Sequence, residues 1–256
     1  MATFNILQGG STLQLMDSSG TLTTLTLPTG VTLDATKIPR FTVYKRYVVV
    51  VNSPTRPITI DTEGTVRVLC PRPPRTLLTL SAVAGGTLSG TFRAKQSFLI
   101  LDIDGNIIAE SALGPLSAAA TTSSQYLKVA GLDLSPDSVS ATRLYRTATN
   151  GSVYFPWIDV DGNTQTSVQD DLSDAGLQLA TAQTLGSPPD LTHIREFKER
   201  LWGRSRTEID ILRYTEGSQM YAWPADNQLM VPREGSDDRG ITAIIARREG
   251  LSVARQ

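Results

Sequence analysis

Hydrophobic and polar residues alternate in short runs along the chain, and residues that favour tight turns separate the runs. A period of two predicts β-strands, because successive side chains of a strand point to opposite faces of its sheet. The densest stretch is residues 140–177, where Asn150-Gly151 suits a two-residue hairpin since both residues tolerate positive φ. A second strand over 152–160 leads to a turn at Asp161-Gly162-Asn163, and we expect the acidic residues of 170–174 in a solvated loop.

The middle of the chain has the strand rhythm of a β-sandwich. The predicted strands are 77–83, 90–103, 106–111, 126–129, 140–146, 152–160 and 165–168. Seven short strands in roughly 100 residues are typical of immunoglobulin-like and fibronectin type III domains. No Cys-Trp-Cys pattern is present, which argues against a true immunoglobulin domain. We therefore predict a fibronectin type III-like sandwich.

Two proline-rich segments divide the chain into three predicted regions. Pro71-Arg72-Pro73-Pro74 is a stiff connector, because proline fixes φ and restricts the residue before it. Gly186-Ser187-Pro188-Pro189 marks a second boundary. The regions are an N-terminal strand region (1–70), the sandwich (71–187) and a C-terminal propeller-like sheet (188–256), so the fold class is all-β.

The two outer regions are predicted from strand length and turn residues. Residues 40–51 predict one long strand with a β-branched end buried on both faces, and 57–69 predict a hairpin. In the last region four strands are expected, with the start of another after them. They are 193–202, 209–214, 227–231 and 240–247, followed by 251–254. This pattern resembles one propeller blade and the first strand of the next.

An isolated blade cannot bury both of its faces. It requires neighbouring blades, because each repeat of such a fold packs mainly on its neighbours. The neighbours of this sheet would come from the N-terminal strands or from another chain.

Composition narrows the function classes. The chain has 256 residues, 40% of them apolar, and its 24 basic and 25 acidic residues leave a formal net charge of −1. This balance gives no bulk attraction to nucleic acids or acidic membranes, although a local basic patch can still exist. The single cysteine, Cys70, cannot form an internal disulfide, and no apolar run reaches the ~18 residues of a membrane span. We expect a chain that is made in a cytoplasm, without a signal peptide or a membrane-spanning segment.

Two acidic loops resemble calcium-binding loops. Asp102 to Asn106 and Asp159 to Asn163 both place oxygen-bearing side chains at positions one, three and five. The glycine needed at position six is replaced by Ile107 in one loop and by Thr164 in the other, and neither loop has a glutamate at position twelve. Hairpin turns are therefore favoured over metal binding, and no metal site is predicted.

No catalytic constellation stands out in the sequence. His193 is the only histidine, so a Ser-His-Asp or Cys-His arrangement would have to use it, and Cys70 lies in another predicted region. No nucleophile elbow, phosphate-binding loop or dinucleotide fingerprint is present. We predict no catalytic residues, no cofactor and no enzymatic activity.

Basic residues cluster around Leu201-Trp202-Gly203 in the last region. They are candidates for contact with DNA in a channel or with another subunit, through phosphate contacts in the first case. These candidates are Arg195, Lys198, Arg200, Arg204 and Arg206. Acidic residues alternate with them, which favours a salt-bridged surface as the alternative.

Several segments carry a family resemblance. They are 44–52 (YKRYVVVVN), 88–92 (LSGTF), 104–111, 143–147 (RLYRT), 197–203 (FKERLWG) and 229–251. In this order, with the proline-rich joint, the chain resembles neck and tail proteins of tailed bacteriophages, of the head-completion, DNA-stabilisation and tail tubular (nozzle) types. In that family a fibronectin-like domain is inserted into a β-propeller. A full propeller needs several more blades of about 40 residues, so further blades would come from other subunits, or the chain is a shortened relative.

The resemblance implies a structural virion protein, a ring-forming adaptor, nozzle or hub that helps to retain or conduct DNA. The implied partners are copies of the same chain, neighbouring neck or tail proteins and packaged DNA. An alternative is a receptor- or carbohydrate-binding module at the tail tip, with the loops at Asn150-Gly151 and Asp161-Gly162 as its contact surface. A polysaccharide-degrading tail enzyme is a weaker alternative, because no facing carboxylate pair can be predicted.

Overall fold

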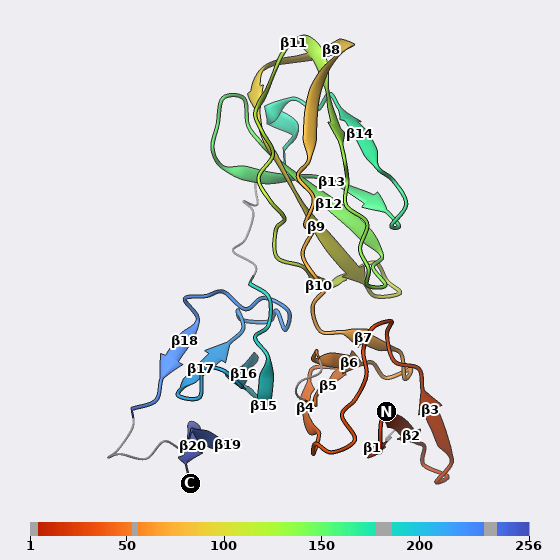
Figure 1. Cartoon of the computed structure of the whole chain (residues 1–256), viewed down its shortest axis with the longest axis vertical. Helices are drawn as coiled ribbons and strands as arrows, with labels where there is room; N and C mark the ends of the chain where they lie inside the picture. The colour runs from red at the N-terminus through yellow and green to blue at the C-terminus, as the bar shows by residue number, and fades with distance from the viewer. Residues whose placement is uncertain (1–4, 53–55, 178–185, 233–239, 256) are drawn as a thin grey trace. The chain divides into compact units, whose positions relative to one another are not determined.

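The computed structural model describes residues 5–52, 56–177, 186–232 and 240–255. These residues form antiparallel β-sheets and one short 3-10 turn, η1 (Asp174–Gly176), so the prediction of an all-β fold is confirmed (Figure 1). Within these ranges, no helix has the length and apolar character needed to cross a membrane.

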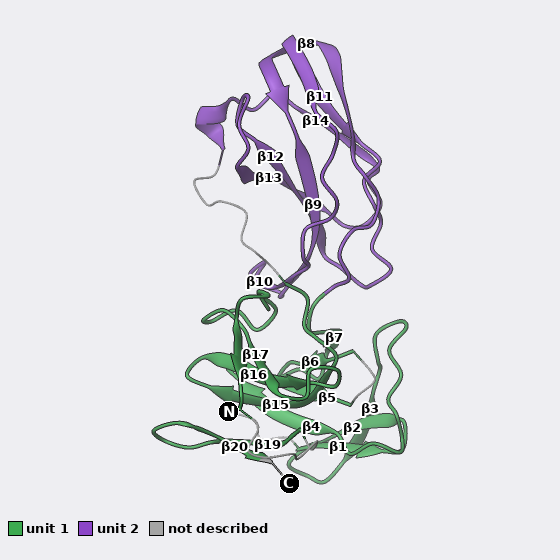
Figure 2. Ribbon diagram, turned by 60° about the vertical axis from the view of Figure 1, so that its left-hand side comes forward, with its two compact units in different colours: residues 1–70, 186–256 green, residues 71–185 purple. Residues whose placement is uncertain are grey.

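The chain forms two compact units (Figure 2). Unit 1 contains residues 1–70 and 186–256, and unit 2 contains residues 71–185. The sequence suggested separate regions at 1–70 and 188–256, but the structure groups these residues in one unit. The reason is that strand β4 (Arg40–Tyr44) lies beside strand β15 (Leu191–Phe197).

Unit 2 is a sandwich of a four-stranded and a three-stranded sheet, with strand orders β10-β9-β12-β13 and β14-β11-β8. Its strands are β8 (Thr79–Phe92), β9 (Ala94–Leu101), β10 (Ile107–Glu110), β11 (Ala120–Ala130), β12 (Ala141–Thr147), β13 (Tyr154–Asp161) and β14 (Ser167–Asp170). Buried side chains of both sheets form the core, among them Ala94 and Leu144 from one sheet and Val129 from the other.

Strand β8 is longer than the sequence predicted. The sequence predicts separate strands over 77–83 and 90–103, but β8 continues through Gly85 and Gly86 to Phe92. A Cβ atom on Gly86 would lie 2.3 Å from the backbone nitrogen of Tyr126. The glycines therefore permit close approach of β8 to β11, in place of a turn.

An ion pair is buried inside the sandwich and joins its two sheets. Arg146 Nε on β12 lies 2.6 Å from Asp170 Oδ2 on β14, and both side chains are fully buried. These two atoms are in ion-pair contact but outside hydrogen-bond geometry. The guanidinium also lies over the Phe92 ring, at 5.2 Å from its centroid, and its Nη1 donates a hydrogen bond to Asp174. The expectation that Asp170 lies in a solvated loop is wrong, because this carboxylate is the counter-ion of a core arginine.

The described residues of unit 1 form four sheets in which consecutive strands pair: β1-β2-β3, β4-β5-β6-β7, β15-β16-β17-β18 and β19-β20. The strands of the first half are β1 (Asn5–Gly9), β2 (Thr12–Met16), β3 (Leu22–Leu25), β4 (Arg40–Tyr44), β5 (Tyr47–Val51), β6 (Ile58–Ile60) and β7 (Val66–Val68). Those of the second half are β15 (Leu191–Phe197), β16 (Arg200–Ser205), β17 (Ile211–Tyr214), β18 (Gln228–Met230), β19 (Ile241–Ala246) and β20 (Leu251–Arg255).

Two runs that predict single strands are hairpins. Residues 40–51 form β4 and β5, which turn at Lys45 with φ of 53°. Residues 193–202 fall on β15 and β16, which turn at Lys198 and Glu199 with φ of 50° and 57°. Neither turn contains the Asn-Gly or Asp-Gly pair by which a hairpin is recognised in a sequence.

The second hairpin changes which strands make up the last four-stranded sheet. The sequence assigned 240–247 as its fourth strand, but β19 pairs with β20 in a sheet of their own. Because β15 and β16 are separate strands, β18 completes the set of four.

Candidate functional site

The first strands of three successive sheets in unit 1 are neighbours: β4 lies beside β15, and β15 lies beside β19 (Figure 1). Thr42 Oγ1 accepts a hydrogen bond from the Glu196 amide at 3.0 Å, and Tyr44 Oη donates one to the Glu199 carbonyl at 3.1 Å. From Thr42 to Tyr44 the partner moves from Glu196 on β15 to Glu199 in the turn that follows it, so β4 and β15 run in the same direction. The first strands of these two antiparallel sheets therefore lie side by side.

His193 lies at this junction of first strands. It pairs with Arg204 in the register of β15 and β16, and the Thr192 hydroxyl lies near both side chains. Thr192 Oγ1 is 3.1 Å from His193 Nδ1 and accepts a hydrogen bond from Arg204 Nη1 at 3.5 Å. Burial, and then the positive charges of Arg40 and Arg204, lower the pKa of His193 below its ordinary value. The imidazole is therefore predominantly neutral at neutral pH.

Arg204 carries a hydrogen-bond donor without an acceptor. Its Nε is buried and has no hydrogen-bond partner within the described part of the chain. Burial lowers the pKa of Arg204, and the charge of Asp210 opposes this shift. Gly240 leaves room for the guanidinium, because a Cβ atom at that position would lie 2.9 Å from Arg204 Nη2. An unpaired buried donor on a cation is unfavourable until an acceptor reaches it.

The structure separates the five predicted basic residues into two groups. Arg206 forms an ion pair with Asp190 at 2.8 Å. Arg200 donates to the Thr215 carbonyl and lies over the Tyr214 ring at 5.3 Å from its centroid. Both arginines therefore make contacts within unit 1, Arg206 in a salt bridge and Arg200 with a carbonyl group and an aromatic ring.

The remaining predicted residues are nearer to solvent or to the histidine. Lys198 lies in the β15–β16 turn, with Nζ 5.3 Å from the centroid of the Phe197 ring. Arg195 is exposed on the same face of β15 as His193, where it is adjacent to Arg204 of the paired strand. Sequence reasoning missed Arg40, because only the packing of β4 against β15 brings its charge to His193.

The first of the two calcium-like loops is a hairpin turn. Asp102 Oδ1 accepts hydrogen bonds from the amides of Asp104 and Asn106, and Gly105 has φ of 81°. The same Asp-x-x-Gly turn occurs at 17–21 and at 61–65, where the aspartate again accepts from the amides two and four residues later. A turn used three times by this chain accounts for the aspartates without a metal ion.

The second loop is also engaged in contacts with the protein. Asp159 pairs with Arg143 at 2.7 Å, and the Asn163 side chain exchanges hydrogen bonds with the backbone of Ser135. Within the described ranges, no three His, Cys, Asp or Glu side chains are grouped so that they could hold a metal ion.

A buried carboxyl lies on the outer face of the sandwich. Glu110 accepts hydrogen bonds from the hydroxyls of Ser97 and Tyr145 and lies 3.4 Å from Arg143. Burial raises the pKa of Glu110, although these three partners oppose the shift. Ser97, Tyr145 and Arg143 lie on strands of the same sheet as Glu110, so these contacts stabilise that sheet.

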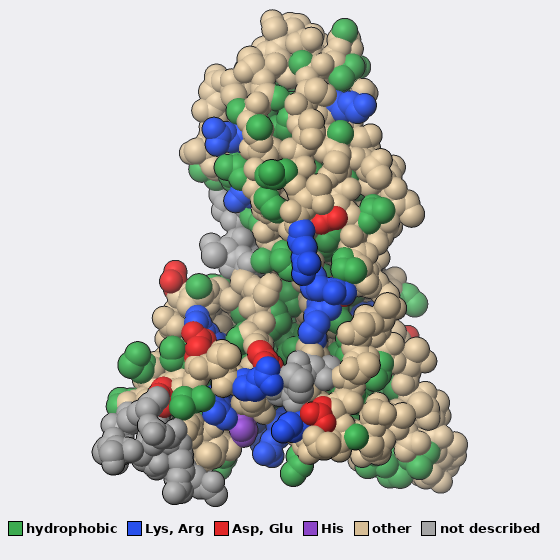
Figure 3. Space-filling view, viewed as in Figure 1, with side chains coloured by type: hydrophobic (Ala, Val, Ile, Leu, Met, Phe, Trp, Pro, Cys, Tyr) green, Lys and Arg blue, Asp and Glu red, His purple; other side chains and the backbone are tan. Residues whose placement is uncertain are grey.

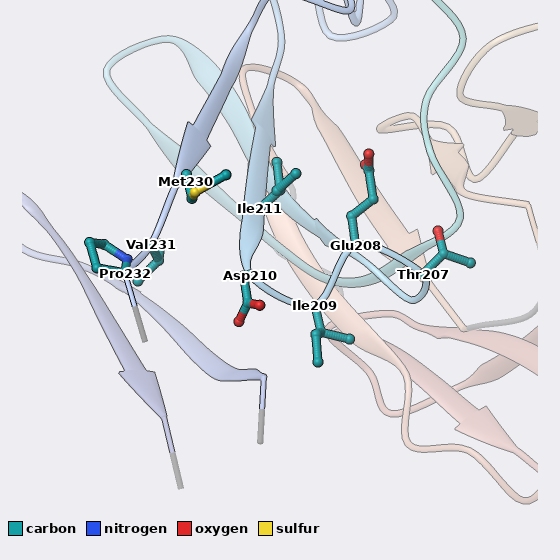
Figure 4. A pocket seen from close by; sticks show the side chains of 8 residues that line it. All are labelled: Thr207, Glu208, Ile209, Asp210, Ile211, Met230, Val231 and Pro232. Carbon is teal, nitrogen blue, oxygen red and sulfur yellow. The ribbon is translucent and has the colours of Figure 1, made fainter. Parts of the chain in front are cut away.

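An apolar pocket of about 430 Å³ adjoins the edge strand β18. Figure 4 shows Ile211 and Met230 on neighbouring strands, with Val231 and Pro232 beyond Met230. Met230 is 71% exposed and Leu229 is 50% exposed. Exposed apolar side chains on an edge strand favour contact with another chain.

No protein-family model matches the chain, and no curated protein matches it in sequence. The resemblance to phage neck and tail proteins therefore stays a prediction.

Proposed function

We propose that this chain is a structural protein of a tailed-phage particle, a ring-forming component of the neck or tail that helps to retain or conduct DNA. One observation carries the proposal. A seven-stranded sandwich is inserted between two four-stranded sheets whose first strands lie side by side. The resemblance implies a fibronectin-like domain inserted into a propeller, and the position of the sandwich between these sheets supports the proposal.

Unpaired strand edges support assembly with other copies. Beside the two four-stranded sheets, unit 1 has a three-stranded sheet and a two-stranded sheet among its described residues. An open edge offers backbone donors and acceptors to another strand, and Leu229 and Met230 add apolar contact area at β18. A ring of identical chains would cover such edges with a repeated interface.

The test is the assembly state of the purified full chain. Rings visible by negative-stain electron microscopy, with a matching mass by light scattering, are the expected result. Met230→Lys at the β18 edge should weaken ring formation. Ile103→Lys is the matched control, because Ile103 is 86% exposed in a turn of the sandwich and the same charge is introduced. A chain that stays monomeric alone and with neck or tail proteins would contradict the proposal. Binding to host cells without rings would favour the receptor-binding alternative.

A further inference from the structure

A group of positively charged side chains meets at the junction of first strands in unit 1. Arg40 lies at the start of β4, Arg195 on β15 and Arg204 on β16, and the charges of Arg40 and Arg204 both act on His193. Figure 3 shows Lys and Arg side chains in blue beside the histidine in purple. The chain as a whole has a net charge of −1, so this is a local concentration of positive charge.

The nearby acids only partly compensate these charges. Glu196 lies on β15, the strand of His193, and its carboxylate accepts a hydrogen bond from the Glu199 amide at 3.0 Å. Asp210 raises the pKa of Arg204, yet burial outweighs it and the pKa of Arg204 is lowered overall. Two guanidinium groups and a histidine therefore share a site in which a further anion would be stabilised.

We infer that Arg40, His193 and Arg204 bind a phosphate of the DNA backbone, without reading the base sequence. The inference rests on the proposed function, which supplies DNA as the partner. A guanidinium presents paired N–H donors that match phosphate oxygens. Arg40 is exposed at the start of β4 and can present such donors to a phosphate, whereas the Nε of Arg204 is buried and the partly buried guanidinium adds positive charge beside it.

Phosphate binding would couple to protonation of His193. The groups that face this imidazole are Arg40 from β4, Arg204 from β16, the Thr192 hydroxyl from β15 and the Thr242 backbone from β19, and Arg195 lies on the same face of β15. The charged members of this set are all cations, so they oppose the protonated imidazole. A bound phosphate adds negative charge and favours the imidazolium. Binding therefore takes up a proton, and affinity increases as the pH falls.

The experiment measures binding of the full chain to a fluorescently labelled DNA duplex of random sequence. The protein is titrated into the DNA at several salt concentrations, and fluorescence anisotropy reports the bound fraction. Arg40→Gln should weaken binding about tenfold and lower the slope of log affinity against log salt by about 1. Arg204→Lys keeps the charge but loses the paired donors, so it should weaken binding and leave the salt slope nearly unchanged. Arg206→Gln is the matched control, because Arg206 is exposed but already paired with Asp190.

A pH series tests the role of His193. The affinity for DNA should increase as the pH is lowered from about 7.5 to about 5.5, a range that brackets the ordinary histidine pKa. This increase should disappear in His193→Gln. Equal weakening by Arg206→Gln, or equal competition by polyglutamate, would overturn the inference of a phosphate site. Circular dichroism of each variant confirms that it is folded. Rings that form normally but bind no DNA would sink this inference and leave the proposed assembly function standing.

Discussion

The Glu196 amide donates a hydrogen bond to the Thr42 hydroxyl at 3.0 Å, although the two residues are 154 positions apart in the sequence. This bond joins β15 to β4, the strands on either side of the inserted sandwich. Thr42 is buried, so water cannot easily replace its hydroxyl as the acceptor. The bond therefore helps to hold together the two halves of unit 1, which precede and follow the sandwich in the chain.

Replacing Thr42 with valine should destabilise unit 1. Valine has nearly the same shape but no hydroxyl, so the Glu196 amide would lose its acceptor, at a cost of about 1–3 kcal/mol. Urea unfolding followed by tryptophan fluorescence measures this cost. A Trp157→Phe background restricts the signal to Trp202 and Trp223, which both belong to unit 1. Thr23→Val, at an exposed position of β3, is the control and should change stability little. An unchanged unfolding midpoint for Thr42→Val would show that the contact is unimportant.

The buried ion pair of Arg146 and Asp170 predicts a large loss of stability in unit 2 when one partner is replaced, and a recovery when both are replaced by apolar residues. Asp170→Asn leaves a fully buried guanidinium without its closest counter-charge, which should cost about 3–5 kcal/mol. The double variant Arg146→Met with Asp170→Leu should recover most of this loss, because an apolar pair needs no compensation. Hydrogen exchange of the β12 amides measures both effects in the intact chain. Asp104→Asn in an exposed turn is the control, and a double variant as unstable as the single one would contradict the argument.

The sequence predicted the strands of the sandwich well because its turns contain recognisable residues. Asn150-Gly151 and Asp104-Gly105 are residue pairs that predict hairpin turns. The positive φ is adopted by Asn150 in the first turn and by Gly105 in the second. The hairpin at Lys198 and Glu199 carries no such signal. Its tight turn is maintained by tertiary contacts, since Tyr44 donates to the Glu199 carbonyl and Ser218 to the Glu199 carboxylate.

The candidate site was predicted only in part for a related reason. Arg195 and Arg204 could be found because they cluster in sequence with other basic residues. Arg40 could not be found, since its position beside His193 depends on β4 packing against a strand that follows the whole sandwich. The unpartnered Nε of Arg204 depends equally on burial between strands, which no local pattern encodes.

The turn at Lys198 and Glu199 predicts a stabilising substitution. Both residues have positive φ, which costs an L-residue with a Cβ atom about 1–2 kcal/mol. Changing the pair to Asn-Gly should raise the unfolding free energy of unit 1 by about 1 kcal/mol, after the loss of the Ser218 contact is subtracted. Thermal melting of the full chain measures the change. The same pair placed at Thr12-Leu13, inside β2, should destabilise the chain, and a loss of stability at 198–199 would show that the turn is not strained.

His193 predicts how the stability of unit 1 depends on pH. Burial and two neighbouring arginines lower its pKa in the folded chain, whereas in the unfolded chain the pKa is near the ordinary value of about 6.5. The unfolded state therefore binds more protons. The contribution of His193 to the stability of unit 1 is fully present above about pH 6.5 and is lost as the pH falls towards the pKa of His193 in the folded chain.

His193→Gln should flatten this part of the stability curve, measured by urea unfolding between about pH 7.5 and about pH 5.5, above the range in which ordinary carboxylates titrate. A slope equal to that of the parent chain would show that His193 is not responsible for the pH dependence of stability.

Bound DNA should reduce the loss of stability at low pH, because a phosphate beside Arg40 and Arg204 favours the protonated imidazole that the free protein disfavours. The stability lost on acidification should then be smaller with DNA than without it, and only in chains that keep His193.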